Sequence, residues 1–179
     1  LNIEFTFTQK MGAYSEFTNL CLVDTLDNMG FARKGQASLF SVSAENAERI
    51  KKQNKKKTSA VMGNPPYNAK QANYNFENSN RAYTEIDARI KETYIKQGSA
   101  QNQIVVYDMY TRFYRWAMDR IGTDGVIAFV TNRSYIDGRA FDGFRKCIQD
   151  EFDFAYITDT NSDVRTNPKI AVTTHNVFG

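Results

Sequence analysis

Short apolar runs recur along the chain and predict buried strands. Residues 20–23, 59–62 and 125–130 are apolar or nearly so, and each run is followed by polar or turn-forming residues. Runs of this length that end abruptly are typical of strands buried on both faces of a parallel sheet. We therefore predict buried strands at these three places and a further strand at residues 156–158.

The segments between the predicted strands carry helical patterns. Residues 43–52 are rich in Ala and Glu, with Ser43 suited to cap the helix N-terminus and basic residues in the last turn. Residues 84–97 place apolar side chains at helical spacing and open with Thr84-x-x-Asp87, the pattern of a capping box. We predict an amphipathic helix in each segment.

Two further helices are predicted in the second half of the chain, at residues 102–120 and 141–152. The first ends before Gly122, a residue type that commonly follows a helix. Its apolar stripe, which we predict to face the core, consists of Val105, Met109, Phe113 and Trp116. Residues 1–8 are ambiguous, because apolar and polar side chains alternate there as in a strand.

Strands that alternate with helices predict an α/β fold with a largely parallel sheet, whose ligands bind outside the carboxyl ends of the strands. Asp24, Asn64 and the pair Thr131–Asn132 each follow a predicted strand, so we expect them to line one edge of the sheet. The polar stretch at residues 68–80 predicts a long exposed loop, and residues 170–178 predict the start of a hairpin.

Composition adds limits rather than a function. A length of 179 residues and a hydrophobic content of 41% fit one globular domain with a substantial core. The net charge of +3 is too small to indicate a nucleic-acid partner by itself. The basic residues nevertheless cluster at Arg49, Lys51, Lys52, Lys55, Lys56 and Lys57. Such a cluster is most often a solvated helix end, and contact with DNA phosphates is the alternative.

Cys21 and Cys147 lie in separate apolar stretches, without the paired spacing of a disulfide framework or a zinc site. No run approaches the roughly 18 apolar residues of a membrane span, and no signal-peptide pattern opens the chain. We expect a soluble, cytoplasmic protein that holds no metal and has no membrane partner.

The sequence Asn64-Pro65-Pro66-Tyr67 follows the second predicted strand and carries the most chemical information. Its chance occurrence in a chain of this length is on the order of one in a thousand. The two prolines fix φ and lack backbone N–H groups, so the turn is stiff and presents carbonyl oxygens that no local donor occupies. The plain interpretation is a stiff loop that ends a strand, and we favour a chemical role over it.

An amino group conjugated to an aromatic ring is a poor nucleophile, but acceptors that bind both of its N–H groups return lone-pair density to nitrogen. The amide oxygen of Asn64 and the carbonyl oxygen of Pro65 can supply both acceptors. The Tyr67 ring offers a face on which a base can stack, and it suits the positive charge of a sulfonium methyl donor. The motif therefore predicts methyl transfer to a planar NH2 group, with no metal in the first step.

These four residues resemble motif IV of S-adenosylmethionine-dependent amino-methyltransferases, Asp/Asn/Ser-Pro-Pro-Tyr/Phe. Longer stretches resemble the methyltransferase core of single-chain type ISP restriction-modification enzymes, namely residues 62–68, 107–110, 128–134 and 141–145. The resemblance spans nearly the whole chain. It implies an incomplete Rossmann-like class I methyltransferase core, in which helices flank a largely parallel sheet and the first strands are missing.

The same resemblance implies transfer of a methyl group from S-adenosylmethionine to adenine N6 of a flipped base in double-stranded DNA. Type ISP enzymes join this activity to nuclease, helicase-like and target-recognition domains in one polypeptide, so residues 1–179 would be an internal part of the catalytic domain. By resemblance, the catalytic residues are Asn64, Pro65, Pro66 and Tyr67, and Asp24 and Asn64 contact the cofactor. Residues expected at the target base or DNA are Tyr67, Lys70, Asn132 and Phe178.

The chain departs from the family pattern in one respect, because no Gly-rich loop for the methionine part of the cofactor precedes Asn64. We expect that loop to lie before Leu1, and we expect the 179-residue chain alone to have little or no activity. The family pattern also makes residues 1–8 the end of a helix, against the strand-like alternation.

Two other functions stay open at the level of sequence. A protein-glutamine or RNA amino-methyltransferase would use the same pair of acceptors on a different planar NH2 group. A noncatalytic nucleic-acid-binding module would use the basic cluster to bind phosphates and keep the Asn64 loop as a relic.

Overall fold

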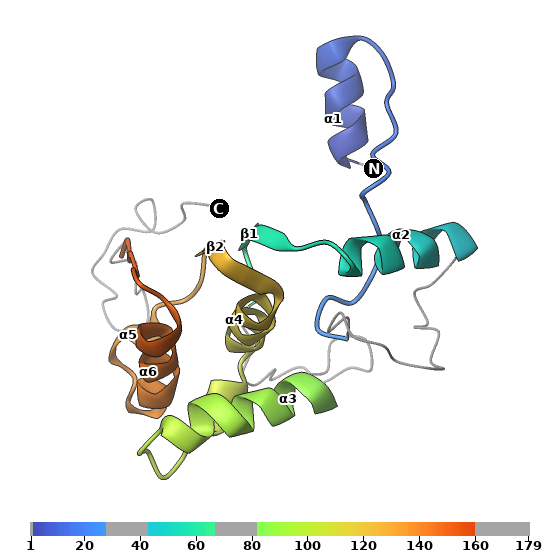
Figure 1. Ribbon diagram of the computed structural model, residues 1–179. Coiled ribbons are helices and arrows are strands. Elements are labelled where there is room, and N and C mark those ends of the chain that lie inside the picture. The colour runs from blue at the N-terminus through green and yellow to red at the C-terminus, as the bar shows by residue number, and fades with distance from the viewer. Residues whose placement is uncertain (1, 28–42, 67–81, 160–179) are drawn as a thin grey trace, which may run out of the picture.

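The computed structural model of the protein describes residues 2–27, 43–66 and 82–159 (Figure 1). Its helices and strands, in chain order, are α1 Asn2–Met11, α2 Ala44–Asn54, β1 Thr58–Gly63, α3 Thr84–Ile90, the π-helical turn η1 Lys91–Ile95, the 3-10 helix η2 Ile104–Tyr107, α4 Met109–Arg120, β2 Ile121–Phe129, α5 Ser134–Asp137, the 3-10 helix η3 Arg139–Phe141 and α6 Asp142–Glu151. In this part of the chain, no helix is long and apolar enough to cross a membrane. The predicted loop at 68–80 and hairpin at 170–178 lie outside the described residues.

β1 and β2 form a two-stranded parallel sheet. The strands run in register at their carboxyl ends, where Gly63 pairs with Phe129, and the register is irregular between Thr58 and Ala60. The second and third predicted strands are thus confirmed, together with the α/β class and the parallel direction.

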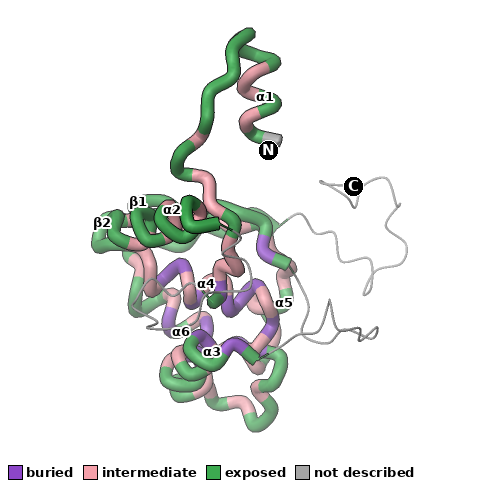
Figure 2. Tube along the Cα trace, turned by 90° about the vertical axis from the view of Figure 1, so that its right-hand side faces the viewer, coloured by how far each residue is buried: buried purple, intermediate pink, exposed green. Residues whose placement is uncertain are grey.

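Among the described residues, helices cover one face of this sheet and leave the other open. On the covered face, the Phe129 ring of β2 meets Tyr114 of α4 edge-on, with centroids 5.0 Å apart, and Ile127 packs against the main core cluster. On the open face, Met62 is 79% exposed and Val126 is 63% exposed (Figure 2). Since parallel sheets are normally covered on both faces, this face is unusual.

The core lies between η1, α4 and α6. Its main cluster contains Ile90, Tyr94, Val106, Tyr110, Met118, Phe141, Phe144 and Cys147. A smaller cluster joins the buried Leu26, Tyr83 and Ile86 to the partly buried Met109, Phe113 and Trp116. α4 therefore packs on two sides.

This packing confirms one prediction about residues 102–120 in part and corrects another. Three members of the predicted stripe, Met109, Phe113 and Trp116, pack against the smaller core cluster, whereas Val105 is 36% exposed. The stripe does not include the other packed side of α4, where Tyr110 and Thr111 are fully buried. The helix is also not continuous. η2 ends at Tyr107, and Asp108 begins α4 by accepting a hydrogen bond from the Tyr110 backbone N–H at 3.4 Å.

A buried arginine ties three helices together. Arg115 of α4 is 1% exposed, and its guanidinium binds Asp119 of the same helix at 2.7 Å and Glu151 of α6 at 2.8 Å. Arg89 of α3 binds Asp119 at 2.8 Å. The ion pairs of Arg115 thus compensate for the burial of its charge, which would otherwise be strongly destabilising.

The predicted helix starts are confirmed in part. Ser43 caps α2 by accepting a hydrogen bond from the Asn46 backbone N–H at 3.1 Å. At the start of α3 the cap lies one residue earlier than predicted, since Asp87 Oδ2 accepts from the backbone N–H of Tyr83 at 3.0 Å and the side chain of Thr84 does not serve as the N-cap. The helix predicted at 141–152 is confirmed as α6.

Three other predictions are corrected. Residues 2–11 form a helix. The family pattern implied this helix, whereas the alternation of apolar and polar side chains at residues 1–8 indicated a strand. Residues 20–23 are not a strand, because both backbone groups of Leu22 are bound by the Asn46 side chain of α2, each at 2.8 Å. Residues 156–158 are not a strand either. Strand formation needs a neighbouring strand, which neither segment has among the described residues.

Candidate functional site

The carboxyl ends of β1 and β2 bring two predicted site segments together. The Val130 N–H donates to the carbonyl oxygen of Gly63 at 3.0 Å, immediately before Asn64 on one strand and Thr131–Asn132 on the other. The two segments therefore leave the sheet side by side. This is the juxtaposition that a parallel sheet imposes on residues following its strands.

The Asn-Pro-Pro turn is anchored at its middle. Pro65 is buried, whereas Asn64 and Pro66 are exposed on either side of it. Because prolines lack an N–H group, packing of the buried Pro65 rather than backbone hydrogen bonds from Pro65 and Pro66 holds the turn. Tyr67, Lys70 and Phe178, the other residues predicted here, lie outside the described residues.

Asn132 is half-buried, and its Oδ1 accepts a hydrogen bond from the Ser134 backbone N–H at 2.8 Å. The side chain thus stabilises the start of α5 through its oxygen.

An aromatic cluster packs against the carboxyl end of β2, and the sequence analysis did not predict it. The ring of Tyr114 packs edge-on against Phe129 and Phe144, with centroids 5.0 Å and 5.3 Å away. The Tyr114 hydroxyl is hydrogen bonded to Tyr135 and Thr131, and burial raises its pKa well above that of a free tyrosine. Tyr114 therefore stays a neutral phenol that holds Thr131 in place and cannot act as a base near neutral pH.

Asp24 lies in a turn fixed from two directions. Its Oδ1 accepts from the Leu26 backbone N–H at 3.1 Å, and its Oδ2 accepts from the Tyr83 hydroxyl at 3.2 Å. The structure attaches Asp24 to the start of α3 rather than to a strand end, because residues 20–23 are not a strand. The expectation that Asp24 follows a strand on the same edge is therefore wrong.

Tyr83 is itself held rigidly. It is 8% exposed, and the Arg112 guanidinium lies over its ring, 5.4 Å from the centroid. Arg112 binds both carboxylate oxygens of Asp87, at 2.7 Å and 3.0 Å, and Asp87 also binds the Tyr83 backbone N–H. Sequence reasoning did not find Tyr83, since 59 residues separate it from Asp24.

The described residues hold no group of three or more His, Cys, Asp or Glu side chains suited to a metal. The cysteines are unpaired, and Cys147 is buried in the core, where desolvation raises its pKa to about 11. A Cys147 thiolate is therefore not formed at neutral pH.

Residues 7–164 match the Eco57I restriction-modification methylase family. Three solved structures are similar to the chain. In the cryoEM structure of a DrdV–DNA complex, the matching part is 55% identical, covers 85% of this chain and has a TM-score of 0.75. In a nuclease-deletion mutant of the type ISP restriction-modification enzyme LlaGI, in complex with a DNA substrate mimic, the matching part is 35% identical, covers 84% of this chain and has a TM-score of 0.73.

The third structure is the ATP-dependent type ISP restriction-modification enzyme LlaBIII bound to DNA, with 37% identity, 80% coverage and a TM-score of 0.68. The chain spans only 14%, 12% and 10% of the lengths of the DrdV, LlaGI and LlaBIII chains, respectively. No curated protein sequence matches the chain.

Proposed function

The chain belongs to the Eco57I restriction-modification methylase family, and from this premise we propose that it is the part of a DNA adenine-N6 methyltransferase that holds the target base. The observation that carries the proposal is the meeting of the Asn64 turn with Thr131–Asn132 at the aligned ends of two parallel strands. This arrangement combines a rigid pair of acceptors with a polar wall supported by aromatic rings.

In the proposed reaction, adenine is extruded from the duplex and its N6 amino group donates to Asn64 Oδ1 and the Pro65 carbonyl oxygen. These two acceptors raise the lone-pair density on N6 and orient that lone pair away from the turn. Tyr67 stacks on the base and offsets part of the cost of extrusion. After transfer, a hydrogen-bonded N6 proton leaves to water and restores the neutral amine.

S-adenosylmethionine, when bound, would supply a methyl group on a positively charged sulfur. Asp24 fits one part of this cofactor, because a carboxylate accepts hydrogen bonds of the kind an adenine amino group donates, and the hydrogen bonds from Leu26 and Tyr83 fix its orientation. Residues for the methionine end of the cofactor are not apparent in the described part of the chain. We therefore assign only adenine recognition to Asp24.

We further propose that β1 and β2 belong to a larger Rossmann-like sheet. The exposed Met62 and Val126 support this, since apolar side chains on the face of a parallel sheet are normally covered by helices. Nuclease, ATP-dependent motor and target-recognition domains in the same polypeptide would fit the small share of the similar structures that the chain spans.

The test is methyl transfer from labelled S-adenosylmethionine by the full-length protein and its Asn64→Ala variant. We expect label on adenine N6 of duplex DNA, reduced at least 100-fold in the variant, because about 3 kcal/mol is typical when one preorganised hydrogen-bonding group at a reacting centre is removed. Asn102→Ala is the matched control, since Asn102 is exposed and its Oδ1 accepts a hydrogen bond from the nearby Ile104 N–H. Label on protein or RNA, with none on DNA, would replace the proposal by the alternative substrates.

A further inference from the structure

Helix α2 is attached to the protein by one polar face. Asn46 binds both backbone groups of Leu22, and the Arg49 guanidinium binds the carbonyl oxygens of Phe17 and Leu20 at 3.4 Å and 3.3 Å. Arg49 also forms ion pairs with Glu16 and Glu45. No residue of α2 is buried, so these contacts and not an apolar core hold the helix.

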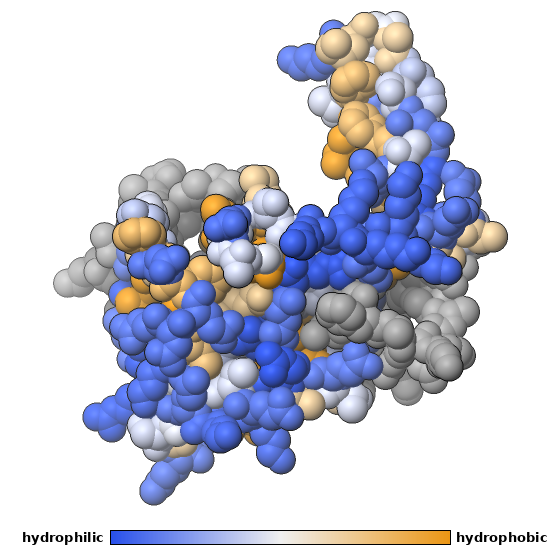
Figure 3. Space-filling view, viewed as in Figure 1, coloured by the Kyte–Doolittle hydropathy of each residue, from blue (hydrophilic) through white to orange (hydrophobic). Residues whose placement is uncertain are grey.

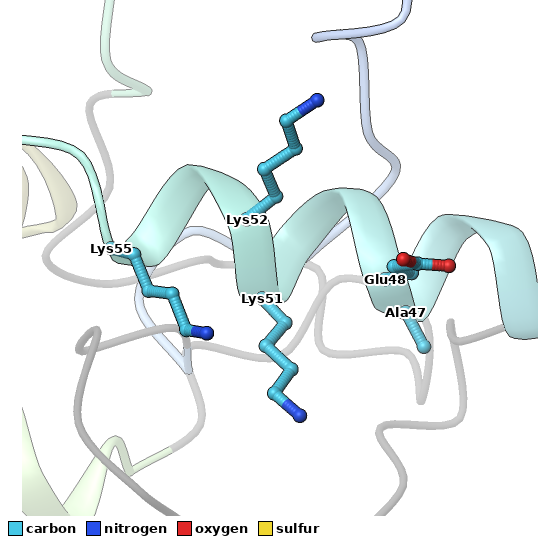
Figure 4. Close-up of a pocket in the computed structure, with 5 residues that line it drawn as sticks. All are labelled: Ala47, Glu48, Lys51, Lys52 and Lys55. Atoms are coloured by element: carbon cyan, nitrogen blue, oxygen red, sulfur yellow. The ribbon is translucent and has the colours of Figure 1, made fainter.

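The remaining surface of α2 carries lysines that form no ion pair with the described residues. Lys51, Lys52 and Lys55 are exposed, and no carboxylate of the described residues forms a salt bridge with them. Figure 3 shows hydrophilic side chains gathered over this helix. Lys51 and Lys55 are four residues apart and point to the same side (Figure 4), an arrangement in which like charges repel.

These lysines line a trough of about 520 Å³ together with Ala47 and Glu48. Glu48 is the one acidic residue in that lining, so the trough carries an excess of positive charge. We define Lys51 of α2 and Lys55, the C-cap residue that points to the same side, as the lysine face of α2. A polyanion bound there would relieve the repulsion that the folded chain leaves uncompensated.

We propose that the lysine face of α2 binds the phosphate backbone of the DNA duplex that enters the methyltransferase site. This inference rests on the proposed function, because it takes DNA to be the substrate. The ammonium groups would act as point charges on phosphates, which fixes the position of the duplex without reading its sequence.

The position of α2 suits this role. The helix ends at Asn54, and β1 begins at Thr58 and carries Asn64 beyond its far end. The six residues of β1 at about 3.3 Å each separate the lysine face from the base site by roughly 20 Å. At 3.4 Å per base pair, this is about six base pairs along the duplex. This separation is within the length of one bound DNA molecule.

The composition of α2 favours a duplex over other anionic partners. Proteins that bind single strands stack bases on aromatic side chains, and α2 contains none. Helices that lie on membranes need a broad apolar face with Trp, Phe or Leu, and the only large aliphatic residue of α2 is Ile50. Lysines without aromatic or apolar neighbours are what backbone contact alone requires.

The experiment measures binding of full-length protein to a fluorescent duplex as a function of salt, for wild type and Lys51→Gln/Lys55→Gln. Glutamine keeps the helix propensity of lysine, so α2 should stay folded. We expect the slope of log affinity against log salt to fall by about 2, roughly one per lysine, with equal loss on cognate and unrelated duplexes. Glu48→Gln should change affinity in the opposite direction and tighten binding.

The matched control is Lys91→Gln/Lys96→Gln, which removes two exposed lysines at η1, away from α2 (Figure 1). An unchanged salt slope in the α2 variant, or an equal change in the control, would overturn the inference. Loss of binding to single-stranded RNA with duplex binding intact would overturn it in favour of RNA. If wild type neither binds nor methylates duplex DNA, the proposed function fails first, and this outcome is distinguishable because it does not depend on the variant.

Discussion

The hydroxyl of Tyr83 donates to Asp24 Oδ2 at 3.2 Å and so connects the start of α3 to the turn that we assign to the cofactor's adenine. Tyr83 lies at the beginning of the first helix after the Asn64 turn in the described chain. Its position is fixed by Arg112 and Asp87. The turn proposed for the cofactor is thereby joined to α3 and α4 through a contact whose partners are themselves held by ion pairing.

Tyr83→Phe should weaken cofactor binding without disturbing the core. Loss of a hydrogen bond to a charged group is worth about 1.5 kcal/mol, so we expect the KM for S-adenosylmethionine to rise about tenfold while kcat changes less than twofold. The KM-against-kcat split in the full-length enzyme tests this. In an Asp24→Ala background the same substitution should have no further effect.

Tyr94→Phe serves as the control, because it removes a buried hydroxyl that contacts Met118 Sδ at 3.3 Å in the core. Equal effects of the two substitutions on KM would show that Tyr83 acts only through general stability.

Arg115→Met should loosen the helical layer. The substitution leaves Glu151 without its partner and Asp119 with Arg89 alone, and breaking a buried ion pair costs about 3 kcal/mol. We expect faster amide hydrogen exchange in α4 and α6 of the full-length protein. Arg115→Lys should restore little of the lost stability, because an ammonium group lacks the planar guanidinium geometry that binds both carboxylates.

The matched comparison is Arg133→Met. Arg133 pairs with Asp137 and Asp159, and its side chain is 40% exposed, against 2% for that of Arg115. Ion pairs open to solvent contribute less than about 1 kcal/mol. A similar change in exchange for both variants would contradict a special role for Arg115.

The same network predicts sensitivity to acid. Burial alone would raise the pKa of Asp119, but Arg89 and Arg115 outweigh it and hold this pKa below its ordinary value. A carboxylate with a lowered folded-state pKa stabilises fully above its unfolded pKa of about 3.9 and loses this contribution as pH falls through the folded value. We expect the protection factors of the α4 amides, which are corrected for the intrinsic pH dependence of exchange, to fall below about pH 4 in wild type.

The α4 amides of Asp119→Asn should be less protected from exchange than those of wild type at neutral pH. Their protection factors should also change less between about pH 6 and about pH 3. Parallel pH profiles for the two proteins would exclude Asp119 as the titrating group.

The sequence was sufficient for elements whose signal is local. The second and third apolar runs pair as β1 and β2 because each is a short apolar segment that ends at a turn, and Asn64 meets Thr131–Asn132 because parallel strands end together. Residues 20–23 have the same local signal but bind the Asn46 side chain instead. No local pattern shows whether a strand finds a neighbour.

The rest of the site depended on long-range packing. Tyr83 and Tyr114 have no motif around them, and their roles come from partners 59 residues away in one case and from an aromatic cluster between α4, β2 and α6 in the other. Likewise, the predicted stripe on residues 102–120 identified one packed side of α4 and missed the other, because α4 packs on two clusters and a single periodicity points to one side only.

Gly143 allows the start of α6 to pack closely against the backbone of residues 94–98. It lies in the Phe141-Asp142-Gly143-Phe144-Arg145 run, at the start of α6, where the helix crosses the π-helical turn η1. A Cβ at this position would lie 1.9 Å from the Tyr94 carbonyl oxygen and 2.6 Å from the Gly98 nitrogen. Both neighbours are backbone atoms and cannot move aside as a flexible side chain can.

Gly143→Ala should therefore push α6 away from η1 and cost about 1–3 kcal/mol, the usual range for overpacking. Gly122→Ala is the control, since nothing lies within 4 Å of a Cβ there. Hydrogen exchange should accelerate in η1 and α6 of the first variant and stay unchanged in the second. Because α6 supports Tyr114 and Tyr135 through Phe144, methyl transfer should also fall in Gly143→Ala, whereas normal activity with loosened helices would separate the core from the site.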